Sequence, residues 1–208
     1  MIVIVDYGIG NLDSVLRGFR HAGAEAVIAS DPAALERADA IVLPGVGSFA
    51  KGMRNLTEQG LLPALNRLVL EEKAPVLGIC LGFQLFTKHS EEGDAEGLGW
   101  IDGVTKRFNF DPMDRRCPVP HIGWNELDVR KENRLLDGIH PGACFYFAHS
   151  YCVHCKDDGA ILATTEYGYD FVSAVERDNI FGTQFHPEKS HANGLDLLRN
   201  FVGLTQHA

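Results

Sequence analysis

The sequence lacks long apolar runs, and no stretch approaches the ~20 residues that a membrane-spanning helix needs. It also lacks a basic surplus, because 19 Lys and Arg stand against 28 Asp and Glu, a formal net charge of −9. Nucleic acid is therefore not expected as a partner, since binding phosphates takes an excess of Lys and Arg. A glycine-rich phosphate-binding loop is absent as well, so nothing predicts a nucleotide site.

Cysteine is sparse. The five cysteines, at positions 80, 117, 144, 152 and 155, are an odd number and too few for a disulfide scaffold. The first residues, MIVIVD, are typical of a core strand and not of a targeting peptide. From these features we expect a cytoplasmic location.

One pair of cysteines needs separate consideration. Cys152 and Cys155 have the CxxC spacing of a zinc site, and His149 and His154 are near in sequence. A structural zinc site normally needs a second ligand pair at similar spacing, and none is present. We therefore expect ordinary strand residues here, with no metal and no cofactor.

The length of 208 residues fits one domain, 1–208. In the first half, short apolar runs alternate with helical patterns, which is typical of a parallel sheet wrapped by helices. Helical apolar spacing follows the N-cap candidate Asn11 and recurs over 61–70. The predicted strands are 2–5, 26–29, 40–43 and 75–79.

The second half is rich in β-type segments, which favours an antiparallel extension of the same sheet. The predicted segments are 104–110, 125–129, 144–147, 160–166, 171–176 and 180–185. Open α/β sheets bind ligands at the carboxyl ends of their parallel strands. Three segments are expected at that edge: 6–11, 44–47 and the segment around Cys80.

Cys80 follows an apolar strand and has a glycine two residues away on each side, Gly78 and Gly82. A nucleophile on a tight strand-to-helix turn needs small neighbours, because side chains would collide there. Free N–H groups at the start of a helix would favour the thiolate. The alternative is a buried structural cysteine, as most lone cysteines in apolar runs are.

A cysteine nucleophile needs a base and a group that orients the base. Among the nine histidines, His186 is the strongest candidate, because it ends an apolar strand and Pro187 stops the strand ladder. Glu188 follows two residues later, and an extended Pro187 would put both side chains on one side. A carboxylate there would fix the imidazole tautomer.

Residues 78–84 (GICLGFQ) together with 186–188 (HPE) resemble the class I glutamine amidotransferases, whose triad runs in the order cysteine, histidine, glutamate. Further segments are similar to the HisH family, the glutaminase subunits of imidazole glycerol phosphate synthase: 6–12, 43–47, 120–125 and 146–151. The resemblance covers nearly the whole chain. It implies an α/β, flavodoxin-like fold with a mostly parallel central sheet, an antiparallel extension and helices on both faces.

The resemblance also implies roles for single residues. Cys80 would attack the side-chain amide of glutamine and His186 would protonate the departing ammonia, with Glu188 as the third triad member. The oxyanion-hole candidates are Leu81, Val46 and Gly47. The substrate-binding candidates are Gln84, Ser150, Tyr151 and Gly45. Glu92 lies in an acidic run, which is usually a solvated surface, so it is not among the substrate-binding candidates.

The chain offers no acceptor site for ammonia, so the resemblance implies a second polypeptide, a HisF-like (β/α)8 cyclase, with Asn11 and Lys189 at the interface. A helix cap and a solvated lysine are the alternatives for these two residues. Segments 99–102 and 167–191 are also similar to HisH-like glutaminases that supply sugar amidotransferases in surface polysaccharide synthesis. A free-standing cysteine amidase and a regulatory pseudo-glutaminase are further alternatives, and the intact triad argues against the latter.

Overall fold

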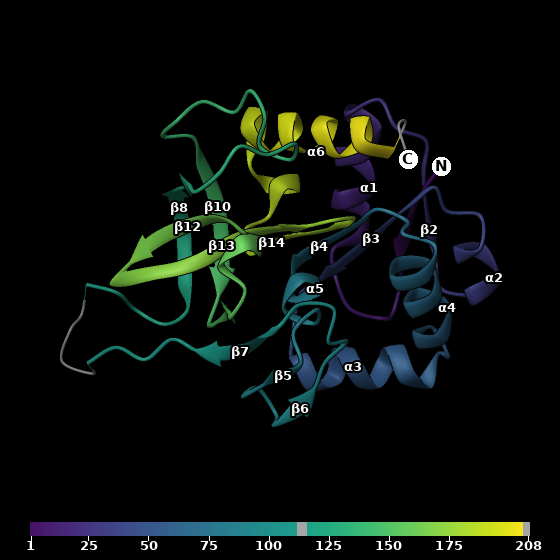
Figure 1. The fold of residues 1–208 in the computed structure, drawn as a ribbon, viewed down its shortest axis with the longest axis horizontal. Coiled ribbons are helices and arrows are strands. Elements are labelled where there is room, and N and C mark those ends of the chain that lie inside the picture. Colours follow the sequence, from purple (N-terminus) through teal and green to yellow (C-terminus); the bar gives the residue numbers. More distant parts are fainter. Residues whose placement is uncertain (112–115, 206–208) are drawn as a thin grey trace.

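The computed structural model describes residues 1–111 and 116–205 (Figure 1). The strands are β1 Ile2–Val5, β2 Ala26–Ala29, β3 Ala40–Gly45, β4 Val76–Cys80, β5 His89–Ser90, β6 Ala95–Glu96, β7 Gly103–Arg107, β8 His121–Glu126, β9 Asp128–Val129, β10 Cys144–His149, β11 Tyr151–Cys155, β12 Ile161–Tyr167, β13 Tyr169–Arg177 and β14 Ile180–Thr183. The helices are α1 Leu12–His21, α2 Pro32–Leu35, α3 Phe49–Glu58, α4 Leu62–Asn66, α5 Leu81–Gln84 and α6 His191–Thr205, with short helical turns η1 Arg67–Glu71, η2 Asp158–Ala160 and η3 Pro187–Lys189.

The central sheet has the strand order β2-β1-β3-β4-β14-β13-β11-β7-β5-β6. The pairs from β2 to β14 are all parallel. From β14 onward the pairs β14–β13, β13–β11 and β11–β7 are antiparallel. The expected arrangement, a mostly parallel centre with an antiparallel extension, is therefore confirmed.

Two apolar layers cover the parallel strands, because alternate side chains of a strand point to opposite faces of the sheet. On one face, Ile2 and Ile4 pack with α1 and α6, for example with Phe19 and Phe201. On the other face, Val3 and Val5 belong to a second cluster with residues of α3, α4 and α5. Figure 1 shows α1 and α6 above the sheet and α3 below it. Helices on both faces are thus confirmed.

The strand predictions for the first half are close to the structure. β1 and β2 have the predicted bounds, β3 continues to Gly45, and β4 is displaced by one residue. Asn11 caps α1, since its side-chain oxygen accepts the Ser14 N–H at 3.4 Å. The predicted helix over 61–70 is divided into α4 and η1.

The second half departs from a simple antiparallel extension in two respects. β14 pairs in parallel with β4 and is part of the central sheet's parallel core. β8 and β10 form a separate two-stranded antiparallel sheet, so the second half does not simply extend the first sheet. The predicted strand 125–129 is divided between the two sheets, with its first part in β8 and its last in β9. Alternation of apolar residues predicts a strand but not the sheet that it joins.

The sequence analysis did not predict the short helix α2 or the two longer helices α3 and α6. α3 buries Phe49, Gly52 and Leu56, and α6 buries Gly194, Leu197, Leu198 and Phe201. Both sets have the spacing of one helix face. Among the helices of the described residues, none has the length and apolarity that would let it cross a membrane.

The CxxC segment lies in β11, as predicted for ordinary strand residues. Cys152 packs in the apolar cluster on one face of the sheet, and Cys155 packs against the cluster on the other face. Positions three apart in a strand point in opposite directions, so the two thiols do not converge.

Candidate active site

Cys80 ends β4 and immediately precedes α5. Its φ of 53° and ψ of −107° are unusual for a residue with a side chain, and such strain is typical of active sites. A Cβ at Gly82 would lie 1.6 Å from the carbonyl oxygen of Leu43, and one at Gly78 would lie 2.7 Å from the Phe83 nitrogen. The predicted reason for the two glycines is confirmed, because no larger residue fits this turn.

His186 and Glu188 form a buried pair at the carboxyl end of β14. The His186 Nδ1–H donates to Glu188 Oε1 at 2.8 Å, and the two side chains are only 2% and 3% exposed. The Tyr146 carbonyl accepts the His186 backbone N–H at 2.9 Å, which fixes the chain here. An extended conformation at Pro187 was expected, but the chain enters the short turn η3 there. This turn brings the carboxylate back to the imidazole.

The surroundings of His186 favour its cationic form. Burial lowers the pKa of the imidazole, but interactions with Cys80 and Glu188 outweigh burial and raise the pKa from 6.5 to about 10. His186 Nε2 is buried and makes no hydrogen bond within the described residues. It is the free position from which a proton can be given to a bound substrate.

The Cys80 sulfur has a polar neighbour that the sequence analysis missed. The Gln184 Nε2 lies 3.7 Å from Cys80 Sγ and donates toward it. Gln184 is fully buried and comes two residues before His186. The available signal was its position two residues before His186, because alternate residues at the end of a strand can share a face.

A cavity of about 250 Å³ opens over Cys80. Its lining brings together most of the predicted site residues from three segments of the chain: Val46, Gly47, Cys80, Leu81, Gln84, Ser150 and Tyr151. Gly45 does not line this cavity. A Cβ at Gly45 would lie 2.3 Å from the Tyr7 hydroxyl and 3.0 Å from Leu81 Cβ. This glycine therefore permits close packing behind the strand-to-helix turn at Cys80.

Gln84 is held in a fixed orientation. Its Nε2 donates to the Tyr151 carbonyl at 2.9 Å and to Gln184 Oε1 at 3.1 Å. Both amide hydrogens are thereby used, and the orientation of the amide leaves Oε1 as the acceptor.

Two segments supply N–H groups near the thiol. Leu81 begins α5, and the first N–H groups of a helix have no acceptor within the helix. On the other side, Gly47 has a φ of 128° and open space where a Cβ would stand. Val46 is 43% exposed. The peptide unit between Val46 and Gly47 therefore has little steric hindrance to rotation.

Glu92 lines the same cavity, although its sequence context suggested a solvated surface. Its Oε2 accepts the Phe49 N–H at 2.8 Å, which places a carboxylate at the N-terminus of α3. Negative charge is stabilised at that end of a helix. No sequence signal could have found this contact, because the two residues are 43 positions apart.

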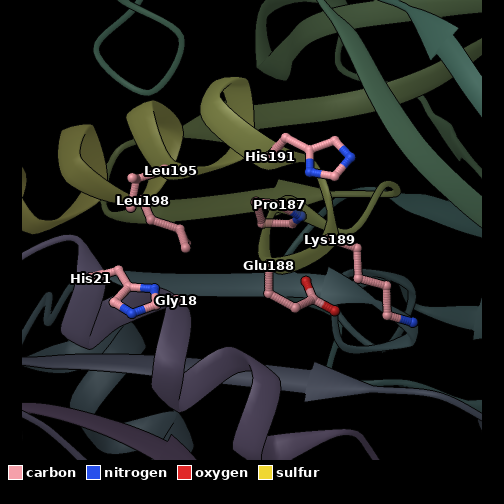
Figure 2. A pocket seen from close by; sticks show the side chains of 8 residues that line it. All are labelled: Gly18, His21, Pro187, Glu188, Lys189, His191, Leu195 and Leu198. Carbon is pink, nitrogen blue, oxygen red and sulfur yellow. The ribbon is translucent and has the colours of Figure 1, made fainter.

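A second cavity of about 340 Å³ lies where α1, η3 and α6 meet (Figure 2). Its lining includes Glu188 and Lys189 but not Cys80. Lys189 Nζ also lies 5.7 Å from the centre of the Tyr146 ring. Asn11 lies outside both cavities as the cap of α1. The structure thus separates the two predicted interface residues from the Cys80 cavity.

Known proteins are similar to this chain in sequence and in fold. The family model for glutamine amidotransferase class-I matches residues 3–204. The chain belongs to this family. The matched range includes Cys80, His186 and Glu188.

Curated relatives are similar over almost their whole length. The chain is 48% identical to "Imidazole glycerol phosphate synthase subunit HisH 2" of Methanococcus maripaludis, with 97% of this chain and 98% of the relative covered. It is 46% identical to the subunit HisH of Leptospira borgpetersenii, with 98% and 100% covered.

Solved structures share the fold. A putative GMP synthase protein from Thermoplasma acidophilum matches with a TM-score of 0.74 at 21% identity, over 99% of this chain and 94% of that one. A structure described as a glutamine amidotransferase also has a TM-score of 0.74, at 20% identity, over 99% and 100%. The expected fold class is therefore confirmed.

Proposed function

We propose that this chain is the glutaminase subunit of imidazole glycerol phosphate synthase. It hydrolyses glutamine to glutamate and ammonia, and passes the ammonia to a HisF-like (β/α)8 cyclase in histidine biosynthesis. The similarity to subunits named HisH, at 46–48% identity over nearly the full chain, carries this proposal. We expect the whole chain to act as one amidotransferase domain in the cytoplasm, where its five free cysteines would stay reduced.

The chemistry starts with His186 protonated, in agreement with the raised pKa of about 10. The Cys80 sulfur attacks the amide carbon of glutamine and forms a tetrahedral intermediate. His186 Nε2 gives its proton to the departing nitrogen, the carbon–nitrogen bond breaks, and ammonia leaves behind a glutamyl thioester. His186, now neutral, accepts a proton from water as the water attacks the thioester. Glutamate is released and the thiolate and the imidazolium are restored.

The tetrahedral intermediate carries an oxyanion that needs donors. The Leu81 N–H is the first donor. The peptide between Val46 and Gly47 supplies the second when it turns its N–H toward the cavity. The positive φ of Gly47 and the open space beside it support this rotation. We infer that the partner and its ligand favour the turned form, so that glutamine is hydrolysed when ammonia is needed.

Glutamine binding uses the polar groups of the cavity. The Oε1 of Gln84 and the main chain of Ser150 and Tyr151 face the α-amino and α-carboxyl groups of the substrate. Gly45 supports the cavity wall from behind. We add Glu92, whose carboxylate lines the cavity and would attract the substrate ammonium group.

An exposed apolar surface at the mouth of the cavity supports a protein partner. Val46, Ile122 and Trp124 are 43%, 63% and 47% exposed, and the first two also line the cavity. Ile122 and Trp124 are two apart in β8 and so share one face. Lys189 and Asn11 would add polar contacts around this surface. Exposed apolar groups near a site typically mark an interaction surface.

The proposal is tested with the purified chain and a HisF-like cyclase. We expect low glutaminase activity alone, and strong stimulation by the cyclase with its phosphorylated ribonucleotide ligand. Full activity of the isolated chain, indifferent to any partner, would contradict the subunit proposal and favour a free-standing amidase. Co-purification from native extract identifies the protein that accepts the ammonia. If that protein were a sugar amidotransferase, the proposed pathway would be polysaccharide synthesis and not histidine biosynthesis.

A matched pair of variants tests the interaction surface. Ile122→Ser should weaken cyclase binding about tenfold or more, because it removes apolar area from the proposed contact. Val129→Ser is the control, since Val129 is similarly exposed at 46% but lies in β9 and does not line the cavity. Equal affinities for both variants, measured by titration calorimetry, would exclude this surface.

A further inference from the structure

A second group of buried histidines lies beside the Cys80 cavity and has no part in the triad. His121 begins β8 and His149 ends β10, and the two residues are direct partners in the antiparallel register. They are 3% and 5% exposed. His121 Nδ1 and His149 Nε2 are 3.2 Å apart, within hydrogen-bond distance.

The direction of the hydrogen bond between the two imidazoles follows from a third group, the Tyr151 carbonyl. His149 Nδ1 lies 2.8 Å from the Tyr151 carbonyl oxygen, which can only accept, so Nδ1 carries the hydrogen. Burial lowers the pKa of His149 to about 3 and that of His121 to about 4, so both rings are neutral at physiological pH. The His149 Nε2 is then an acceptor, and the His121 Nδ1–H must be its donor.

The chain of hydrogen bonds ends at the glutamine-binding main chain. The Tyr151 carbonyl receives one hydrogen bond from His149 and another from Gln84 Nε2 at 2.9 Å. Both lone pairs of this oxygen are therefore occupied. Gln84, His149 and Tyr151 all line the Cys80 cavity, whereas His121 does not.

Aromatic side chains fix the His121 ring. Its centre is 3.9 Å from that of Tyr167 and 4.9 Å from that of Phe147, and both pairs are stacked at an interplanar angle of 24°. The Tyr167 hydroxyl donates to the Pro118 carbonyl at 2.7 Å, which holds this ring in place. The donor at the start of the chain is therefore preorganised before substrate binds.

We propose that His121 is a positioning residue for glutamine, acting through His149 on the Tyr151 carbonyl and the Gln84 amide. The inference rests on the proposed glutaminase function. The His121 donor and the Tyr151 carbonyl together favour one tautomer of His149, and His149 holds the carbonyl that orients Gln84. Without the His121 donor, the buried Nε2 of His149 is left unsatisfied, and only the Tyr151 carbonyl still holds the ring.

The experiment compares two substitutions of His121 in the full chain, assayed with its stimulating partner. His121→Asn keeps an N–H donor near the position of Nδ1, whereas His121→Leu removes the donor and keeps an apolar side chain. We expect His121→Leu to raise the KM for glutamine about tenfold with kcat within about threefold, since one hydrogen bond to a buried group is lost. His121→Asn should restore most of the affinity.

A spectroscopic readout separates positioning from a general structural role. In the wild type, ¹⁵N NMR of the histidines should show His149 protonated at Nδ1 and unprotonated at Nε2. The His149 Nε2 signal should move in His121→Leu and return toward its wild-type position in His121→Asn.

Three results would overturn the proposal. They are equal KM values for the two variants, a fall in kcat at unchanged KM, and a His149 protonated at Nε2 in the wild type. If the wild type hydrolyses no glutamine with any partner, the proposed function fails, and the NMR spectra still decide whether the hydrogen-bond chain exists.

Discussion

His186 and the His121–His149 pair are all deeply buried, yet they have opposite charge states. The pKa of His186 is raised to about 10, whereas the pKa values of His121 and His149 are lowered to about 4 and about 3. Burial acts in the same direction on all three. The difference comes from the neighbours. His186 interacts with a carboxylate and with the charge of a nearby thiol group, whereas His149 contacts a carbonyl and another imidazole.

The two regions also influence each other. The positive charge of His186 opposes protonation of His149, in addition to the effect of burial. A cationic His186 therefore helps to keep the neighbouring imidazole neutral. One histidine, His186, can therefore transfer protons while two others, His121 and His149, stay neutral and position the substrate.

The largest effect is expected when Cys80 is removed. Cys80→Ala should reduce glutamine hydrolysis by about 10⁴-fold or more, because no nucleophile remains. The pKa of His186 should also fall, since Cys80 contributes to raising it. Activity assays and a ¹⁵N NMR titration check both parts. A His186 pKa that stays near 10 would show that Glu188 alone sets its charge.

The second effect concerns the carboxylate. Glu188→Gln keeps an acceptor for the His186 Nδ1–H but removes the negative charge, so we expect about 100-fold lower kcat and a lower His186 pKa. The pH profile of kcat should shift with the pKa. His121 and His149 titrate at acid pH, where His186 is cationic, so we expect them to titrate as in the wild type. A change in their titration would show that the Glu188 charge acts on them as well.

A smaller effect is expected at Gln184. Gln184→Leu removes the donor that lies 3.7 Å from Cys80 Sγ and the acceptor for Gln84. We expect about tenfold lower kcat/KM, as for one or two hydrogen bonds. Gln184→Glu is the comparison, since it keeps an acceptor for Gln84 but replaces the donor. If both variants were fully active, neither contact would matter for the reaction.

The smallest effect concerns stability in acid. His121 and His149 are neutral when folded but take up protons when unfolded as the pH falls below about 6.5. The unfolded state then binds more protons, so the free energy of unfolding decreases from about pH 6.5 toward pH 4. His186 affects stability at alkaline pH instead. Its contribution to the free energy of unfolding is full below about pH 6.5 and is lost as the pH rises through about 10.

His121→Leu tests the acid side. The loss of stability between pH 7 and pH 5, from urea unfolding, should be smaller in the variant by on the order of 1 kcal/mol, a value that allows for solvent screening. His21→Leu, at an exposed position, is the control and should lose as much as the wild type. An equal loss in all three proteins would show that His121 is not the cause.

Sequence patterns were sufficient where the chemistry is local. The glycines around Cys80, the cap at Asn11 and the strands of the first half depend on near neighbours in the chain, and each was predicted at or within two residues of its place. The bend at Pro187 was not predicted, although it too is local, because an X-Pro segment fits both an extended chain and a turn.

Contacts between distant segments were beyond such patterns. Glu92 reaches the cavity by way of the N-terminus of α3, and β8 pairs with β10 outside the central sheet. The sequence by itself determined the strand-to-helix turn at Cys80 and the order of cysteine, histidine and glutamate, because tight turns and strand ends restrict which residues fit. Only the tertiary structure decided which buried histidine is charged, because that depends on partners brought together from far along the chain.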